Sequence, residues 1–388
     1  MSLQRFAAYS FVFVILGLFF YSFTQVDLSL TLSQASIFQT VEKSFQQIGY
    51  FNRPLSAGLY LLFLILMFSY YVYFLYLAYK KRIATKDIFI IITLTGIFLT
   101  FSYNAFSYDL FNYIFDAKII TFYHKSPYIY KALDFPVDPM LSFMHWTHRY
   151  YPYGPFWLVL TAPLSYAGAN IFLLTFFIFK SLATAFYLGA AFLVYKIGKK
   201  VNENYALFGL TMFALNPLVI IESLVSAHND IAMVFFALLG VYLFIEKKKI
   251  LGIIMVILSA FIKIPTILLL IPMIINTLPV KKIQLSQNNF LISLALLSML
   301  GTFYSLTQLE IQPWYFLWAL PFICLLKPNK YIVTASLGFS LGLLLRYLPF
   351  LYFGTWEGIV LPIRNYLTIF AVIIPLIPVL LTDLIKKG

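Results

Sequence analysis

The chain has 388 residues, of which 62% are hydrophobic and 11% charged, with a mean hydropathy of +0.89. Soluble domains keep roughly a quarter of their residues charged, so this composition excludes an ordinary soluble globule. The net charge is +13, but the basic residues form short clusters between apolar runs. That pattern is typical of the inner loops of a membrane protein and not of a nucleic-acid-binding surface. We therefore expect an all-α polytopic membrane protein, with membrane lipids and no nucleic acid among its partners.

The basic clusters predict the direction in which each apolar run crosses the membrane. They lie at 80–86, 196–200, 247–249, 281–282, 327–330 and 386–387. With these clusters inside, the runs give about twelve crossings, with both termini inside and 1–388 as a single transmembrane domain. The expected spans are about 6–24, 55–79, 87–106, 170–195, 205–222, 231–246, two within 250–278, and then 289–307, 314–326, 331–349 and 358–382. The first run follows Arg5 without a small-residue cleavage site, so we interpret it as the first helix and not as a signal peptide.

Three segments are not expected to form a single helix that crosses the membrane. The stretch 107–155 is weakly hydrophobic and is expected to be an outer loop that carries interfacial helices and the catalytic groups. The run 156–167 is too short to cross unaided, so we predict a short or re-entrant helix. Pro265 in "KIP" removes a backbone donor and disfavours helix at Ile264, which predicts two helices that meet outside near Lys263.

Most acidic residues fall on or near the outer side in this topology. Acidic residues contribute little to membrane orientation, so their clustering needs another cause. We expect the chemistry of the protein on that face. These acids are Asp27, Glu42, Asp109, Asp116, Asp134, Asp138, Glu222, Asp230, Glu310 and Glu357.

The stretch "SYDLFNYIFDAKII" places two acids seven residues apart. On a helix, Asp109, Asn112 and Asp116 share one face, together with Tyr113. One interpretation is an amphipathic interfacial helix whose acids face water. The other is that a carboxylate, with its pKa raised by desolvation, serves as a general base. Asp109 is the better candidate because the preceding membrane helix would hold it in place.

The same loop continues with "HWTHRYYPYGP". Arg149 suits a pair of phosphate oxygens, and Tyr153 is a candidate for substrate binding. Pro152 and Pro155 stiffen the turn, and Gly154 permits either a close backbone approach or a positive φ. Aromatic residues are also common at membrane interfaces, which is the alternative explanation for the tyrosines and the tryptophan.

Polar residues interrupt two later apolar runs. His228, Asn229 and Asp230 in "SAHNDIAM" are either functional or paired, or else Asn229 or Asp230 caps the next helix. No HxH or HExxH spacing supports a metal at His228 and Asp230, so no metal is predicted. Lys263 either reaches a lipid headgroup or forms an anion site for a lipid phosphate.

Trp314 and Tyr315 in "QPWYFLW" suit either an interfacial aromatic belt or stacking on a sugar. A base, phosphate-binding cations and aromatic faces on one side are the groups that transfer of a sugar from a lipid phosphate needs. The sequence contains neither GxGxxG nor a Walker motif, so no nucleotide fold is expected. Cys324 is the single cysteine, which excludes a disulfide framework and a cysteine metal site.

The motif order resembles the GT-C superfamily of integral-membrane glycosyltransferases. The motifs are "SYDLFNYIFDAKII", "SPYIY", "HWTHRYYPYGP", "AHND", "KIPT" and "QPWYFLWALP", over about 107–321. They are most similar to polyprenyl-phosphate-mannose-dependent mannosyltransferases related to the mycobacterial α-1,6-mannopyranosyltransferases. The resemblance implies inverting transfer of a hexose, with mannose expected, from a polyprenyl phosphate to a glycan or glycolipid acceptor. It also implies a prokaryotic plasma membrane with the site on the extracytoplasmic face.

By the same resemblance Asp109 would be the general base that deprotonates the acceptor hydroxyl. The candidates for the donor phosphate are Arg149, His228, Asn229 and Lys263. The candidates for the sugar or acceptor are Tyr113, Asp116, Tyr153, Asp230, Trp314 and Tyr315.

The sequence departs from the family pattern in two respects. The family often has a second acid next to the key aspartate, whereas Tyr108 and Leu110 flank Asp109 here, so we expect neither a metal nor a cofactor. The chain is also short for the group and lacks a soluble C-terminal domain, so loops would select the acceptor. The alternative is a transporter or flippase of a lipid-linked sugar, which would hold its polar groups at the bilayer midplane. A third candidate is an O-antigen ligase or polymerase.

Overall fold

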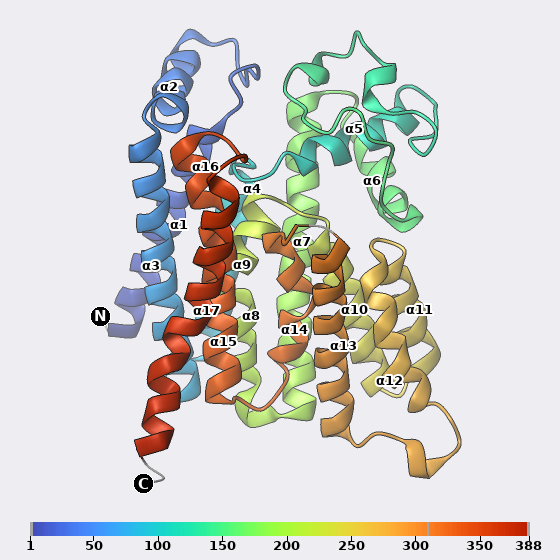
Figure 1. Ribbon diagram of the computed structural model, residues 1–388. Coiled ribbons are helices and arrows are strands. Elements are labelled where there is room, and N and C mark those ends of the chain that lie inside the picture. The colour runs from blue at the N-terminus through green and yellow to red at the C-terminus, as the bar shows by residue number, and fades with distance from the viewer. Residues whose placement is uncertain (1–2, 309, 386–388) are drawn as a thin grey trace.

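The computed structural model describes residues 3–308 and 310–385, and every regular element in them is helical (Figure 1). Helices satisfy all backbone donors and acceptors within the segment, which apolar surroundings require. The α-helices are α1 (Leu3–Ser22), α2 (Ser36–Gln46), α3 (Arg53–Tyr79), α4 (Thr85–Thr100), α5 (Asp109–Thr121), α6 (Pro155–Ala167), α7 (Phe172–Val201), α8 (Ala206–Ala214), α9 (Pro217–Ile220), α10 (Asp230–Ile245), α11 (Lys249–Ala260), α12 (Leu270–Ile275), α13 (Gln287–Gln308), α14 (Leu320–Ile323), α15 (Lys330–Leu345), α16 (Tyr347–Phe353) and α17 (Val360–Ile385).

Four stretches of the described chain are long and apolar enough to cross a membrane. They are α3, α7, the α15–α16 segment Lys330–Phe353 and the α17 segment Val360–Asp383. A bent pair that includes α8 and α9 raises the number to five if it is one span. Several other apolar helices, including α10 and α11, are shorter than a bilayer-spanning helix of about 20 residues. The helical membrane class is thus supported, and the count of about twelve crossings stays a prediction.

The expected span 205–222 is bent, because the chain changes direction by 52° between Ala214 and Pro217, and it is a crossing only if the bent pair is one span. The side chain of Asn216 accepts a hydrogen bond from the backbone N–H of Leu218 at 2.9 Å, and Pro217 occupies the first helical turn. This combination starts a new helix and prevents continuation of the old one. A π-turn, η6 (Ile221–Val225), follows and leads to the 226–229 link.

Three other sequence-based boundaries compare directly with the structure. The run 156–167 is the short helix α6, whose 13 residues extend about 20 Å. The break at "KIP" is confirmed, since α11 ends at Ala260 and a 3₁₀-helix, η7 (Ile264–Leu269), begins beyond Lys263. The stretch between the first two expected spans contains α2.

The basic clusters gather at one end of the molecule, at the lower side of Figure 1, while α5 and α6 lie at the other end. Several cluster residues contact segments that lie beside another cluster in the sequence: Lys81 with Asn204, Lys200 with Glu246, Lys249 with the carbonyl of Asn276, and Lys330 with Asp383. The predicted cluster at 386–387 lies outside the described residues. The described clusters therefore share one end, as the topology prediction requires.

Candidate active site

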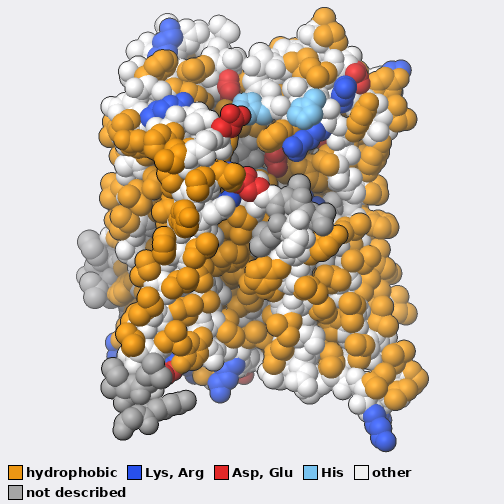
Figure 2. All heavy atoms as spheres, in the orientation of Figure 1, with side chains coloured by type: hydrophobic (Ala, Val, Ile, Leu, Met, Phe, Trp, Pro, Cys, Tyr) orange, Lys and Arg blue, Asp and Glu red, His pale blue; other side chains and the backbone are white. Residues whose placement is uncertain are grey.

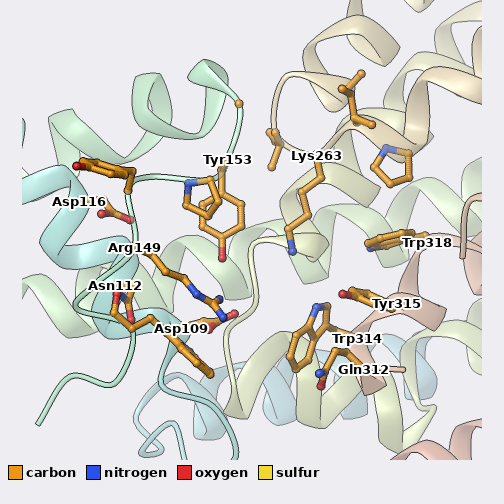
Figure 3. Close-up of a pocket in the computed structure, with 18 of the residues that line it drawn as sticks. Asp109, Asn112, Asp116, Arg149, Tyr153, Lys263, Gln312, Trp314, Tyr315 and Trp318 are labelled. Carbon is orange, nitrogen blue, oxygen red and sulfur yellow. The ribbon is translucent and has the colours of Figure 1, made fainter. Parts of the chain in front are cut away.

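A cavity of about 700 Å³ lies between segments that are far apart in the sequence (Figure 3). Its walls come from α5, from 146–154, from the link 260–265 and from 310–318. Figure 2 shows a hollow in the upper half of one face, with acidic, basic and histidine side chains around it. The cavity is thus at the end of the molecule where α5 lies, opposite the basic clusters.

Helix α5 contributes the predicted polar stripe to this cavity. Asp109, Asn112 and Asp116 all line it, as their helical spacing indicates. The helix begins at Asp109, whose N–H donates to Ser107 Oγ at 3.1 Å and whose charge suits a helix N-terminus. The other faces are buried, so an amphipathic helix at the water interface is the wrong description. The buried residues are Leu110, Phe111, Tyr113, Ile114, Phe115, Ala117 and Ile119.

Asp109 is backed by a buried histidine and a second carboxylate. His228 Nδ1 lies 3.5 Å from Asp109 Oδ2, and its Nε2 lies 3.3 Å from Glu222 Oε2. The hydroxyl of Tyr347 donates to Glu222 Oε1 at 3.0 Å. Trp314 stacks on the imidazole, with the ring centroids 4.0 Å apart. These contacts fix the imidazole between two acids and fix Asp109 at the cavity wall.

The two aspartates of α5, Asp109 and Asp116, have pKa values shifted in opposite directions. Burial alone would raise the pKa of Asp109, but the contact with His228 and the charges of His228, Lys263 and Arg149 outweigh it and lower the pKa below its ordinary value. Burial, assisted by the charge of Asp109, raises the pKa of Asp116 to about 8. At neutral pH Asp109 is therefore ionised and Asp116 mainly protonated, which gives the two carboxyl groups different chemistry.

His228 itself is charged in this setting. Burial lowers the pKa of an imidazole, but the contacts with Asp109 and Glu222 and their charges raise the pKa of His228 to about 9. The protonated ring therefore neutralises part of the negative charge of its two neighbours. Ala227, directly before it, has φ +53°, a conformation that few residues other than glycine adopt and that turns the chain sharply here.

The polar residues after His228 are paired, and they do not cap α10. Asn229 occupies the N-cap position without a side-chain cap hydrogen bond, and its Oδ1 accepts from the hydroxyl of Tyr113 at 3.3 Å. Asp230 accepts from Lys263 Nζ and from Trp318 Nε1, each at 2.6 Å. The capping interpretation is therefore wrong for Asn229, and Asp230 ties α10 to two parts of the cavity wall.

The turn around Gly154 packs directly on the link after α11. The N–H of Gly154 donates to Ile262 O, and that of Phe156 donates to Phe261 O, both at 3.1 Å. A Cβ on Gly154 would lie 2.0 Å from Phe261 O, so the glycine permits a close backbone approach. Its φ is −71°, so a positive φ is not the reason for it. This contact places the Tyr153 ring 5.3 Å from Lys263 Nζ.

The predicted site residues fall into two groups, one on the cavity wall and one behind it. The wall residues are Asp109, Asp116, Arg149, Tyr153, Lys263, Trp314 and Tyr315. The second group does not line the cavity. Tyr113, His228 and Asp230 contact wall residues, and Asn229 contacts Tyr113. His228 and Asn229, expected at the donor phosphate, are thus placed behind Asp109 and Tyr113.

Other residues of the wall were absent from the sequence-based site. They include Asn112, Trp146, Glu310, Gln312 and Trp318. Helical spacing from Asp109 could have identified Asn112, and the "QPWYFLW" motif contains Gln312 and Trp318. Glu222 had no signal beyond being an acid in an apolar run. Among the described residues, no group of three His, Cys, Asp or Glu side chains could hold a metal ion.

An apolar helical chain with a polar cavity at one end, walled by an ionised carboxylate, two cations and indole rings, has the architecture of a membrane-embedded enzyme. Residues 10–278 match the family model described as alpha-(1->6)-mannopyranosyltransferase, N-terminal domain. The match covers more than half of the chain, and the chain belongs to that family. The protein is therefore a glycosyltransferase of a mannosyltransferase family, and the resemblance seen in its motifs is confirmed. Neither a curated protein nor a solved structure matches the chain.

Proposed function

We propose that this protein moves a hexose, with mannose the expected sugar, from a polyprenyl phosphate to the hydroxyl of a glycan or glycolipid acceptor, with inversion at the anomeric carbon. One observation carries the proposal. The cavity brings the ionised Asp109 together with two cations, Arg149 and Lys263, and with the ring of Trp314. Such a donor carries its own leaving group, so the transfer needs a base and a site for the phosphate.

In the proposed step Asp109 accepts the proton of the acceptor hydroxyl. The hydroxyl oxygen forms a bond to the anomeric carbon from the face opposite the phosphate, and the bond from that carbon to the phosphate oxygen breaks. The electron pair leaves with the polyprenyl phosphate. The pKa of Asp109 is lowered, whereas the sequence predicted a raised pKa for the base, so its carboxylate is ionised at neutral pH and can accept the proton.

Arg149 and Lys263 are the proposed partners of the donor phosphate. Lys263 shares its charge with Asp230, with 2.6 Å between Nζ and Oδ2. The guanidinium of Arg149 lies 4.1 Å from the centroid of the Trp146 ring, and no described acid forms an ion pair with it. Arg149 is therefore the less neutralised cation, and its planar fork suits two phosphate oxygens.

His228 acts through Asp109 in this proposal. Its buried ring has no place on the cavity wall, and it contacts both Asp109 and Glu222. A protonated imidazole held by stacking on Trp314 orients the base and keeps it ionised. His228 and Glu222 are thus positioning residues, whereas Asp109 is the catalytic residue.

The proposed location of the reaction is the extracytoplasmic face. The described basic clusters share the end of the molecule opposite the cavity. Since basic loops stay inside, this arrangement supports an outward-facing cavity. The carrier lipid would then present its phosphate at the outer leaflet, which the cavity could reach.

Asp109→Asn tests the proposal, because it keeps the size of the side chain and removes the base. Purified protein in detergent is given radiolabelled polyprenyl-phosphate-mannose and octyl α-mannopyranoside. We expect kcat to fall by about 10²–10⁴-fold, the usual contribution of a general base. Asp134→Asn is the matched control, since Asp134 is exposed in the same 107–155 segment and does not line the cavity.

Equal transfer by wild type and Asp109→Asn would refute the mechanism. The transporter alternative predicts a different result in proteoliposomes. A transporter would move the labelled lipid from one leaflet to the other without forming a glycosidic bond. Wild type and Asp109→Asn would then both give no glycosylated product.

A further inference from the structure

Glu310 is a further acidic residue on the cavity wall, and the proposed transfer does not use it. It precedes the 3₁₀-helix η9 (Pro313–Trp318), and its side chain is 37% exposed. Two arginines contact it from behind. Arg346 and Arg364 have side chains only 2% and 7% exposed, and neither lines the cavity.

Both arginines contact the same oxygen of Glu310. Nη2 of Arg346 lies 3.2 Å from Oε1, and Nη2 of Arg364 also donates to Oε1. Among the described residues, no donor is assigned to Oε2. The carboxylate is thus held by one oxygen from behind, and its second oxygen is available to a ligand.

The arginines are themselves fixed by further contacts. Nη1 of Arg346 donates to Asn365 Oδ1 at 2.9 Å. The guanidinium of Arg364 lies 5.0 Å from the centroid of the Trp356 ring, which in turn stacks on Phe350 at 4.2 Å. These contacts hold two positive charges behind a single carboxylate.

Stability alone is a weak reason for this arrangement. Burying two guanidinium groups costs free energy, and their attraction to a single half-exposed carboxylate often fails to repay it. An apolar pair of similar volume would tie the same helices together at least as well. What the arginines provide, and an apolar pair would not, is a rigid hydrogen-bond acceptor at the cavity wall.

We propose that Glu310 binds hydroxyl groups of the hexopyranose in this cavity and so selects the sugar. The inference rests on the proposed function only in taking a sugar as the occupant. A carboxylate accepts strong hydrogen bonds from hydroxyl donors. It repels an anionic phosphate, so the phosphate end would lie at Arg149 and Lys263 and the ring hydroxyls at Glu310.

The neighbours of Glu310 suit the same ligand. Gln312 and Trp314 follow it on the same segment, and Figure 3 shows them across the cavity from Asn112 and Asp116. An indole face packs on the C–H surface of a sugar while an amide and a carboxylate bond to its hydroxyls. Glu310 would therefore hold the sugar from the side opposite α5, where Asp109 lies.

Glu310→Gln is the test, read by binding and not by transfer. Glutamine keeps an acceptor oxygen for the arginines and replaces Oε2 with an NH₂ group, which cannot accept. Titration of the purified protein with methyl α-mannopyranoside, followed by tryptophan fluorescence, measures the affinity. We expect Kd to rise about tenfold or more, the size expected for losing a charge-assisted hydrogen bond. Glu357→Gln is the matched control, since Glu357 is exposed and does not line the cavity.

Deoxy-mannosides identify the hydroxyl. The analogue that lacks the hydroxyl bound by Glu310 should lose as much affinity for wild type as the full sugar loses for Glu310→Gln. That analogue should bind wild type and variant equally. Three results would each overturn the inference. The first is an unchanged Kd in Glu310→Gln, and the second is that every deoxy analogue loses the same affinity for wild type as for the variant. The third is that wild type does not bind methyl α-mannopyranoside.

A folding defect is separated from a binding defect by a second variant. Glu310→Asp keeps the charge beside Arg346 and Arg364 but is one methylene shorter. We expect it to keep the thermal unfolding temperature of wild type and to lose affinity like the glutamine variant. The test of the proposed function is separate from this one. If Asp109→Asn transfers sugar as well as wild type, Asp109 is not the base, but the binding of the mannoside to Glu310 is unaffected.

Discussion

Raising the pH from 6.5 to 9 should destabilise the folded protein by deprotonating His228. The imidazole contacts Asp109 and Glu222, and in the folded state its pKa is raised from 6.5 to about 9. The folded protein therefore holds this proton more tightly than the unfolded chain does. The resulting stabilisation is fully present below pH 6.5 and is lost as the pH rises through about 9.

The size of the effect follows from the two pKa values. Each pH unit between them corresponds to 1.36 kcal/mol, so a rise from 6.5 to about 9 contributes about 3 kcal/mol to the free energy of unfolding. Asp116 acts in the same direction over a lower window, from 3.8 to about 8, because its pKa is also raised. The Asp116→Asn protein removes that overlap and is the right background for the measurement.

The free energy of unfolding is measured by SDS titration from dodecyl maltoside micelles, at pH 6.5 and pH 9. Spectra of ¹⁵N-labelled histidine rings report the titration of His228 itself, with His228→Gln used to assign its signal. We expect a midpoint near pH 9 and a loss of about 3 kcal/mol over the window. A midpoint near 6.5, or a loss below about 1 kcal/mol, would refute the buried ion-pair arrangement behind Asp109.

The remaining predictions concern the cavity wall and the phosphate. Gly154→Ala should lower transfer at least tenfold, because the new Cβ would lie 2.0 Å from Phe261 O and push the turn away from the link that carries Lys263. Gly58→Ala, at an exposed position of α3 with no atom within 4 Å of the new Cβ, should leave transfer unchanged, and equal effects of the two substitutions would contradict the packing argument. Dialysis against EDTA should leave transfer intact, since Arg149 and Lys263 supply positive charge for the phosphate. A loss restored by Mg²⁺ would show that they do not suffice.

Local features of the sequence predicted local structure well. The spacing of Asp109, Asn112 and Asp116 predicted one helical face, and all three line the cavity. Pro265 predicted the break near Lys263, and α11 and η7 end and begin on either side of it. Each of these features depends on residues within one or two helical turns, and such residues are in contact whatever the rest of the chain does.

The bend at Asn216 is a feature that hydropathy did not predict. The run 205–222 is mainly apolar, which predicts a single span. Its direction changes because Asn216 and Pro217 start a new helix, and the buried amide of Asn216 finds an acceptor in Ser340 Oγ at 2.9 Å. Only a partner from a remote helix makes a buried asparagine acceptable at that point.

The sequence by itself determined the membrane class, the mannosyltransferase family and the residues of α5 that line the cavity. Tertiary structure alone decided the contacts within the site. It put His228 between Asp109 and Glu222, and it aimed Arg346 and Arg364 at one oxygen of Glu310. Ion pairs and pKa shifts depend on which distant helices pack together and on how much water they exclude, and no periodicity in the chain records either.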